Sequence, residues 1–151
     1  GPNLHHTKLS PDEQLTHITL WSMLCSPLLL GCDLSSLDQF TTDLLTNDEV
    51  IAVNQDPLGV QAKQYTADRF FEVWAKPLYD GTMAVALFNK GLKPTTVRIN
   101  WSELNIACCN NPVRDLWQKK NLGFFRDGYS SIVPAHGAVF IQVGKPAKTS
   151  F

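Results

Sequence analysis

The chain has 151 residues, of which 44% are hydrophobic and 18% charged, enough apolar material for one core or for one core and part of another. Its 13 Lys and Arg against 14 Asp and Glu give a formal net charge of -1, which argues against nucleic acid as a partner. The longest apolar run, residues 25–32, contains Pro27 and Gly31 and is far shorter than the roughly 20 residues of a membrane-spanning helix. We therefore expect neither a nucleic-acid nor a membrane partner.

The four cysteines show no metal-binding pattern. Cys25, Cys32, Cys108 and Cys109 form no CxxC pair and have no matching histidine spacing, so a structural zinc site is not expected. We expect buried free thiols, because a bond between the adjacent residues Cys108 and Cys109 would be strained. No cofactor is predicted.

A helix is expected to begin after Ser10. The segment Ser-Pro-Asp-Glu at residues 10–13 is a capping box with proline at the first helical position. Leu15, Ile18 and Trp21 follow at helical spacing and predict one apolar stripe, and Pro27 should end the helix.

A buried strand and two shorter helical segments are expected next. Residues 27–31, Pro-Leu-Leu-Leu-Gly, are continuously apolar between breakers, as in strands covered on both faces. Ser35 and Ser36 offer N-caps for a helix, and Asn47 with Glu49 can begin a last helical turn. Four apolar side chains of the first of these helices are expected to point inward: Leu37, Phe40, Leu44 and Leu45. Such an α-β-α unit cannot close a core alone, because both faces of its strand need neighbours.

The chain changes character near residues 55–59, Gln-Asp-Pro-Leu-Gly. Short apolar segments with turn residues between them then follow, and Asp80-Gly81 predicts a hairpin turn. Strands are predicted at residues 70–76, 83–89, 95–100, 113–117, 129–133 and 138–143. We predict an antiparallel sandwich of about seven or eight strands over residues 60–145, followed by a tail at residues 146–151.

Three blocks of sequence carry a family resemblance. They are Gln-Leu-Thr-His-Ile-Thr-Leu-Trp at residues 14–21, Ser-Pro-Leu-Leu-Leu-Gly-Cys-Asp-Leu at 26–34, and Asn-Asp-Glu-Val-Ile-Ala-Val-Asn-Gln-Asp-Pro-Leu-Gly at 47–59. In this order they resemble the melibiase family of α-galactosidases. The resemblance implies that residues 1–59 are the end of a catalytic (β/α)₈ barrel, with residues 10–56 as its seventh helix, eighth strand and eighth helix, and that residues 60–145 are the C-terminal β domain. The fold class is then α+β.

The resemblance also implies a retaining glycosidase that cleaves a terminal α-linked galactose. Such enzymes need two carboxylates about 5–5.5 Å apart, one as nucleophile and one as acid and base. Both family motifs that hold these aspartates would precede Gly1, so no catalytic residue is assigned here and this chain alone is expected to be inactive. It should pack against the rest of the barrel. The resemblance leaves a secreted, periplasmic or lysosomal location open.

Asp33 is the one candidate for substrate binding. It follows the predicted strand at residues 27–31, and barrel enzymes build their sites at the carboxyl ends of strands. A supporting role behind the site, or an N-cap for the helix that starts near Ser35, is the stronger interpretation. Asp56, in a loop before a proline, is expected to bind backbone N–H groups.

A non-catalytic sandwich with a structural or carbohydrate-binding role is the alternative. Trp74, Trp101 and Trp117 could form platforms for sugar rings, although aromatic side chains in alternating strands more often pack in the core. The barrel-like blocks at residues 14–59 argue against this alternative, because a binding module has no use for them.

Overall fold

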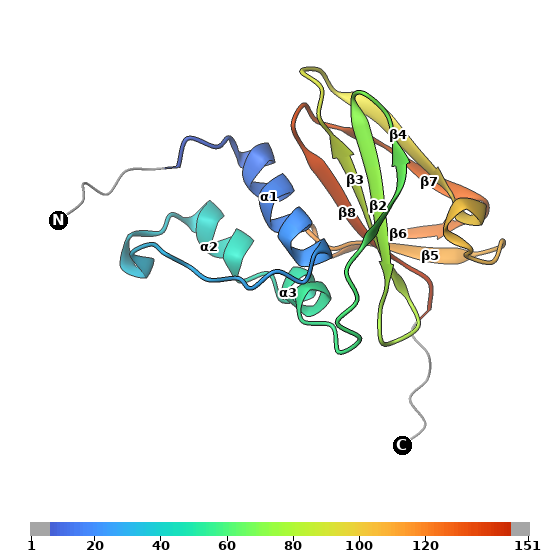
Figure 1. Ribbon diagram of the computed structural model, residues 1–151, viewed down its shortest axis with the longest axis horizontal. Coiled ribbons are helices and arrows are strands. Elements are labelled where there is room, and N and C mark those ends of the chain that lie inside the picture. Colours follow the sequence, from blue (N-terminus) through green and yellow to red (C-terminus); the bar gives the residue numbers. More distant parts are fainter. Residues whose placement is uncertain (1–6, 146–151) are drawn as a thin grey trace.

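The computed structural model describes residues 7–145, with three α-helices followed by eight strands (Figure 1). The helices are α1 (Pro11–Met23), α2 (Gln39–Leu45) and α3 (Asp48–Asn54), and short 3-10 helices lie at η1 (Leu34–Ser36) and η2 (Trp101–Leu104). The strands are β1 (Lys63–Ala67), β2 (Phe71–Pro77), β3 (Met83–Asn89), β4 (Thr95–Asn100), β5 (Asn111–Asp115), β6 (Lys120–Phe125), β7 (Gly128–Val133) and β8 (Ala138–Val143). The order confirms the predicted α+β class. The predicted tail at residues 146–151 lies outside the described residues.

The strands form two antiparallel sheets with a core between them. One sheet has the order β1-β2-β3-β8-β5-β6, and β4 pairs with β7 in the other. Val73 and Ala75 of β2 point into this core, where they meet Val97 and Ile99 of β4. The buried Trp101 of η2 closes the core at one end. The predicted antiparallel sandwich is confirmed.

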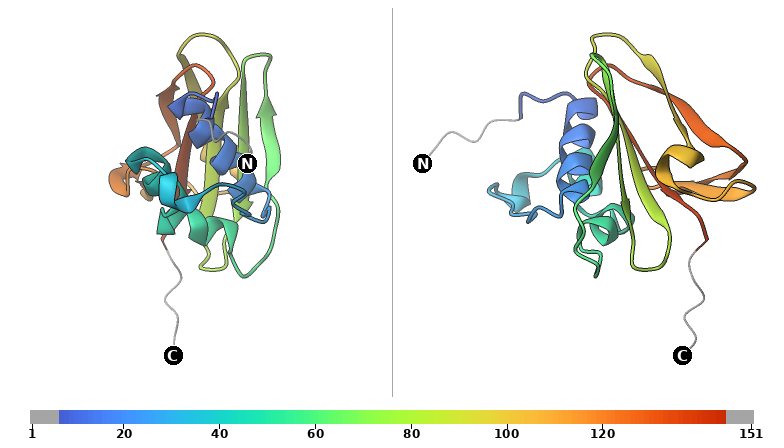
Figure 2. Two further views of the ribbon diagram at one scale, coloured as in Figure 1. Left: turned by 90° about the vertical axis from the view of Figure 1, so that its left-hand side faces the viewer. Right: turned by 45° about the vertical axis from the view of Figure 1, so that its right-hand side comes forward.

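The outer face of the larger sheet is also buried. Helix α1 lies against β2, β3 and β8, and α3 packs beside α1 on the same apolar cluster (Figures 1 and 2). Met23, Val50 and Val53 form a second apolar cluster with side chains of the outer sheet face, among them Ala86 and Phe140. The helical segment and the sandwich therefore share a core.

The strand predicted at residues 27–31 is not present, and that prediction is wrong. These residues have no regular structure, and Leu29 and Leu30 are 87% and 49% exposed. A strand buried on both faces needs neighbours that accept and donate its backbone hydrogen bonds. None of the strands described in residues 7–145 pairs with this segment.

Helix α1 begins as predicted but buries a different face. Both hydrogen bonds of the capping box are present, from Glu13 N to Ser10 Oγ and from Ser10 N to Glu13 Oε2. The buried residues are Thr19, Ser22 and Met23, whereas Trp21 is 37% exposed. Of the predicted stripe, Ile18 packs against the apolar cluster under the helices, whereas Trp21 does not, so the stripe marks only part of the packed side.

The cap of the next helix was also predicted wrongly. Asp38, rather than Ser35 or Ser36, caps α2, and its carboxylate accepts from Thr41 N at 2.7 Å. Of its four expected inward side chains, only Leu44 is buried. Asn47 caps α3 as predicted.

The strand predictions hold best where apolar residues alternate or cluster. Strands β3, β4 and β8 match the predicted ranges, whereas β1 and β6 were not predicted. Both missed strands lie at the edges of the larger sheet and have mostly exposed side chains, so hydrophobic periodicity gives little signal there.

All four cysteines are free, but the expectation of burial is wrong for three of them. Cys25 is half-buried, whereas Cys32, Cys108 and Cys109 are exposed.

Candidate functional site

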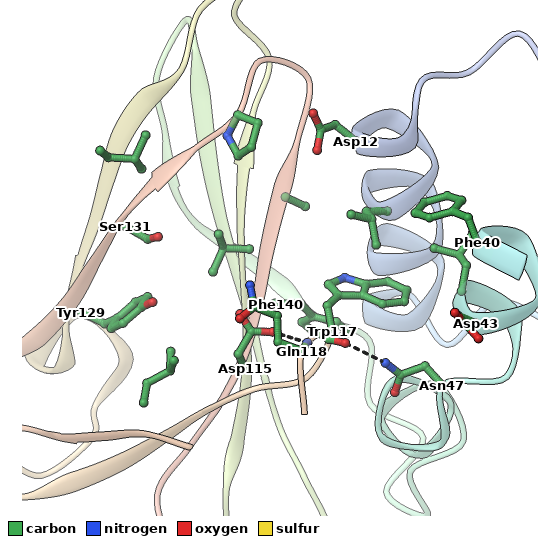
Figure 3. Close-up of a pocket in the computed structure, with 17 residues that line it drawn as sticks. Asp12, Phe40, Asp43, Asn47, Asp115, Trp117, Gln118, Tyr129, Ser131 and Phe140 are labelled. Atoms are coloured by element: carbon green, nitrogen blue, oxygen red, sulfur yellow. Dashed lines mark hydrogen bonds between the residues drawn. The ribbon is translucent and has the colours of Figure 1, made fainter. Parts of the chain in front are cut away.

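A cleft lies where the helices meet the sandwich (Figure 3). It has a volume of about 560 Å³. Figure 3 shows Phe40 and Asp43 on the helical wall, Tyr129 and Ser131 on the strand wall, and Trp117 between them.

Polar side chains of α1 hold this helix against the sandwich at one side of the cleft. The His136 Nδ1 and Glu13 Oε1 atoms are 3.0 Å apart, and the Thr16 hydroxyl donates to the backbone carbonyl of His136 at 2.7 Å. The hydrogen bond with His136 is the main cause that lowers the pKa of Glu13. Trp117 Nε1 donates to the Thr19 hydroxyl at 2.9 Å. His136, in the turn between β7 and β8, therefore holds α1 against the sandwich.

Helix α3 is fastened to the sandwich by Asn47 and Glu49. The buried Asn47 caps the helix with its Oδ1, while its Nδ2 donates to the Leu116 carbonyl at 3.0 Å. Glu49 accepts two hydrogen bonds from Arg114, at 2.8 Å from Nε and 2.6 Å from Nη2. This pairing raises the pKa of the Arg114 guanidinium.

A buried lysine joins both helices to β2. Lys76 is 1% exposed, and its Nζ donates to the Ser22 carbonyl at 3.0 Å, the Val53 carbonyl at 2.8 Å and Cys25 Sγ at 3.2 Å. The two carbonyls belong to the last turns of α1 and α3, where the helix dipole favours a positive charge. Sequence reasoning missed this residue, because a lysine within a strand gives no sign that helix ends will meet it.

Asp33 lies outside the cleft, and its carboxylate caps η1. It accepts from Ser35 N at 2.9 Å, Ser35 Oγ at 2.7 Å and Ser36 Oγ at 3.1 Å. These hydrogen bonds, with that of the Ser35 hydroxyl first, lower the pKa of Asp33. The side chain is exposed and makes the N-cap that the sequence allowed.

Asp56 binds backbone N–H groups, as expected. Its Oδ1 accepts from Leu58 N at 3.1 Å, and both carboxylate oxygens accept from Tyr79 N, at 3.1 and 3.0 Å. It thereby links the end of the helical segment to the β2–β3 turn.

The carboxylates around the cleft do not form the arrangement of a retaining glycosidase. Asp12, Asp43 and Asp115 come from α1, α2 and β5, and Figure 3 shows them at separate places on its walls. Asp43 accepts from Gln39 Nε2 at 2.7 Å, and Asp115 accepts from the backbone of Gln118 at 2.8 Å. Asp43 and Asp115 therefore make local hydrogen bonds. The cleft is better described as the space between the helices and the sandwich where the two pack together.

The three tryptophans of the β half serve packing. Trp101 is buried in the sandwich core, and its Nε1 donates to the Phe125 carbonyl at 3.1 Å. Trp74 and Trp117 lie in the cluster under the helices. Trp74 and Trp117 are half-buried, and Trp117 also lines the cleft, so packing is the role that the structure shows for all three side chains.

No metal centre is found in the part of the chain that the structure describes. Among residues 7–145, no group of three or more His, Cys, Asp or Glu side chains is placed to hold an ion. Over the same residues, no helix is long and apolar enough to cross a bilayer.

Sequence comparison finds two family models that match consecutive parts of the chain. The model described as the α-galactosidase C-terminal β-sandwich domain matches residues 68–143, and that of α-galactosidase A matches residues 4–56. A probable α-galactosidase from Dictyostelium discoideum is 42% identical over 141 residues, which are 89% of this chain and 36% of that protein. α-Galactosidase 2 from Arabidopsis thaliana is 37% identical over 85% of this chain and 33% of its own length.

Solved structures share the fold over nearly the whole chain. α-Galactosidase I from Mortierella vinacea superimposes with a TM-score of 0.89 at 30% identity, over 98% of this chain and 39% of that one. A GH27 β-L-arabinopyranosidase from Geobacillus stearothermophilus gives a TM-score of 0.86 at 30% identity, over 97% of this chain and 33% of that one.

A helical segment packed on an antiparallel sandwich, matched in this order, defines the C-terminal region of a glycoside hydrolase. The chain belongs to the melibiase (GH27) family of α-galactosidases and comprises the end of its catalytic domain with its C-terminal β-sandwich domain. It spans about a third of the length of the curated relatives that it matches.

Proposed function

We propose that this chain is the C-terminal portion of an α-galactosidase that cleaves terminal α-linked galactose with retention of configuration. The observation that carries the proposal is the match of two α-galactosidase models, in order, to residues 4–56 and 68–143. The catalytic aspartates belong to a barrel portion outside these residues, and the chain alone is inactive. In the cleft, the carboxylates of Asp43 and Asp115 accept local hydrogen bonds, which supports the placement of the catalytic residues elsewhere.

The partner of the helical segment is the rest of the barrel. The segment that resembles the eighth barrel strand, residues 27–31, exposes Leu29 and Leu30, and Leu34 beyond it is 62% exposed. Barrel strands on either side would cover these leucines and pair with the backbone. The boundary between the two domains falls at residues 59–60, after α3 and before β1.

Asp33 has a positioning role in this proposal. It follows the segment of the eighth strand, at the end where barrel enzymes bind substrate. Its carboxylate already accepts three hydrogen bonds from Ser35 and Ser36, so it shapes the loop rather than contacting the sugar.

The specificity for one sugar is determined by residues outside this chain. The α-galactosidase from Mortierella vinacea and the β-L-arabinopyranosidase from Geobacillus stearothermophilus match it almost equally well. A region shared by enzymes with different substrates does not choose between them, because specificity in barrel enzymes comes from loops at the ends of many strands.

The test is hydrolysis of an aryl α-galactoside by the 151-residue chain and by the longest polypeptide that its gene encodes, with an aryl β-L-arabinopyranoside as second substrate. We expect activity on the galactoside in the longer polypeptide only. Activity of the short chain would overturn the placement of the catalytic aspartates. A longer polypeptide active only on the arabinopyranoside, or on neither substrate, would overturn the proposed substrate.

A further inference from the structure

Two adjacent thiols are exposed on a loop of the sandwich. Cys108 and Cys109 lie between η2 and β5, and their Sγ atoms are 3.2 Å apart in a thiol–thiol hydrogen bond. The loop lies at the side of the sandwich away from α1, α2 and α3, near η2, which is drawn in gold (Figures 1 and 2). A change there would leave the joint between helices and sheet untouched.

The backbone holds the two thiols on the same side. Cys109 and the next residue, Asn110, have φ angles of 81° and 55°, the left-handed region that side chains other than glycine seldom adopt. Cys109 N donates to the Arg126 carbonyl at 3.1 Å, and Asn111 Nδ2 donates to the Ala107 carbonyl at 2.7 Å. Because the loop is anchored in this way, the thiols are already close and little freedom would be lost when they join.

The surroundings favour redox chemistry over metal binding. Among residues 7–145 there is no third His, Cys, Asp or Glu ligand placed with this pair. The hydrogen bond to Cys108, with the nearby Asp127 as a weaker cause, raises the pKa of Cys109. Because the two Sγ atoms share a hydrogen bond, a thiolate formed on either one accepts the S–H of the other.

We propose that Cys108 and Cys109 form a site of reversible oxidation by small disulfides of the glutathione class. One of the two thiols, as its thiolate, attacks one sulfur of the small disulfide, forms a mixed disulfide and releases one small thiolate. The second thiol then loses its proton to solvent and attacks the protein sulfur of the mixed disulfide, which forms the intrachain bond and releases the second small thiolate. In total, two protein thiols and one small disulfide become one protein disulfide and two small thiols.

The closed form would be easily reduced. Adjacent Cα atoms across a trans peptide lie about 3.8 Å apart, closer than the roughly 4.4–6.8 Å that is usual across a disulfide. Strained and exposed disulfides are the labile ones, so a small excess of thiol reopens the bond.

The experiment treats the folded chain with glutathione disulfide, blocks remaining thiols with iodoacetamide and determines the mass of the tryptic peptide Ile99–Arg114. This peptide contains Cys108 and Cys109 and no other cysteine. We expect it to lose two hydrogen atoms without gaining glutathione, and to regain them after dithiothreitol. A retained glutathione adduct, an intermolecular disulfide or an unreacted pair would each overturn the proposal.

Serine variants test the two steps separately. Cys109→Ser should stop at a stable glutathione adduct on Cys108 and Cys108→Ser at one on Cys109, whereas Cys32→Ser should close the pair like the original chain. Phenylarsine oxide, which bridges two neighbouring thiols with loss of water, gives a measurement on the unaltered chain. We expect it to protect both thiols of this peptide from iodoacetamide, and failure to protect them would show that they cannot act together.

Discussion

Lys76 carries a buried amine whose hydrogen bonds all go to the helical layer. Its three acceptors are the carbonyls of Ser22 and Val53 and the sulfur of Cys25. A Lys76→Met substitution keeps the length of the side chain but leaves these acceptors without their donor. We expect the free energy of unfolding to fall by about 1–3 kcal/mol, measured by urea denaturation.

Lys63→Met is the matched control, because Lys63 is exposed on β1. Surface substitutions of this kind change the free energy of unfolding by about 0.5 kcal/mol or less. If Lys76→Met were as stable as the original chain, the cost of burying the amine would equal the gain from its hydrogen bonds, and Lys76 would not hold the helices in place.

Glu13 gives a prediction for the pH dependence of stability. Its pKa is lowered from 4.5 by the hydrogen bond with His136 and by the backbone of Ser10. The lowered pKa means that the folded chain binds the Glu13 carboxyl proton less tightly than the unfolded chain does. The ionised Glu13 therefore stabilises the fold at pH values above its pKa in the unfolded chain. This stabilisation is lost as the pH falls through its pKa in the folded chain. The advantage of the original chain over Glu13→Gln should therefore shrink as the pH falls below 4.5.

Urea denaturation of both proteins at a series of pH values would measure this advantage. Asp12→Asn is the control, since it removes a carboxylate from the same helical turn without touching the contact between Glu13 and His136. An advantage that stays constant down to the lowest pH would mean that the Glu13 charge contributes nothing to folding.

At the scale of elements, Asn47 combines two functions at the start of α3. Its Oδ1 accepts from Glu49 N and Val50 N, while its Nδ2 donates to the carbonyls of Leu116 and Trp117. Asn47→Ala removes both the cap and the link to the β5–β6 turn, and it leaves buried carbonyls unsatisfied. We expect a loss of about 2–4 kcal/mol in the free energy of unfolding, more than the roughly 1 kcal/mol of an ordinary cap.

Asp38→Ala provides the comparison, because Asp38 caps the more exposed helix α2. Thermal unfolding followed by circular dichroism would rank the two variants. Equal losses would mean that the hydrogen bonds of Asn47 to the sandwich add nothing to its cap.

The elements that could be predicted are those whose signals are local. The capping box at Ser10, the cap at Asn47 and the apolar strands β3, β4 and β8 all depend on residues close together in the sequence. The edge strands β1 and β6 were missed because they bury little, and β6 also contains a glycine. The strand at residues 27–31 was predicted from its composition, but a strand forms only where another strand pairs with it.

The candidate site was less predictable than the fold. The positions of Asp33 and Asp56 follow from local turn chemistry and were anticipated as acceptors of hydrogen bonds. The contacts of His136 with α1 and of Lys76 with the helix ends join residues far apart in the sequence. Nothing in a single sequence indicates which distant side chains will meet, so these contacts became visible only in the structure.

For the molecule as a whole, the helical segment buries the outer face of the larger sheet of the sandwich. Both faces of the central strands β2, β3 and β8 of the larger sheet are buried, one by β4 and β7 and the other by α1 and α3. The helices and the sheet should therefore unfold in one transition, because neither can leave the shared cluster without exposing the other.

Removal of residues 1–59 tests this coupling. The shortened chain would expose the outer-face side chains Ala84, Ala86, Phe88, Leu116 and Phe140, which are buried in the full chain. Contiguous apolar patches of this kind drive association. We expect the fragment of residues 60–151 to self-associate and to unfold at a lower urea concentration than the full chain, as measured by light scattering and by tryptophan fluorescence.

A chain of residues 9–151 is the control, because it retains the capping box and both covering helices and should match the full chain. If the fragment of residues 60–151 stayed monomeric with an unchanged midpoint, the sandwich would be independent of its cover. The contacts of Lys76, Asn47 and Arg114 would then stabilise the position of the helices without stabilising the sheet. Under the coupling inferred here the dependence is mutual, since the outer sheet face is the surface on which α1 and α3 pack.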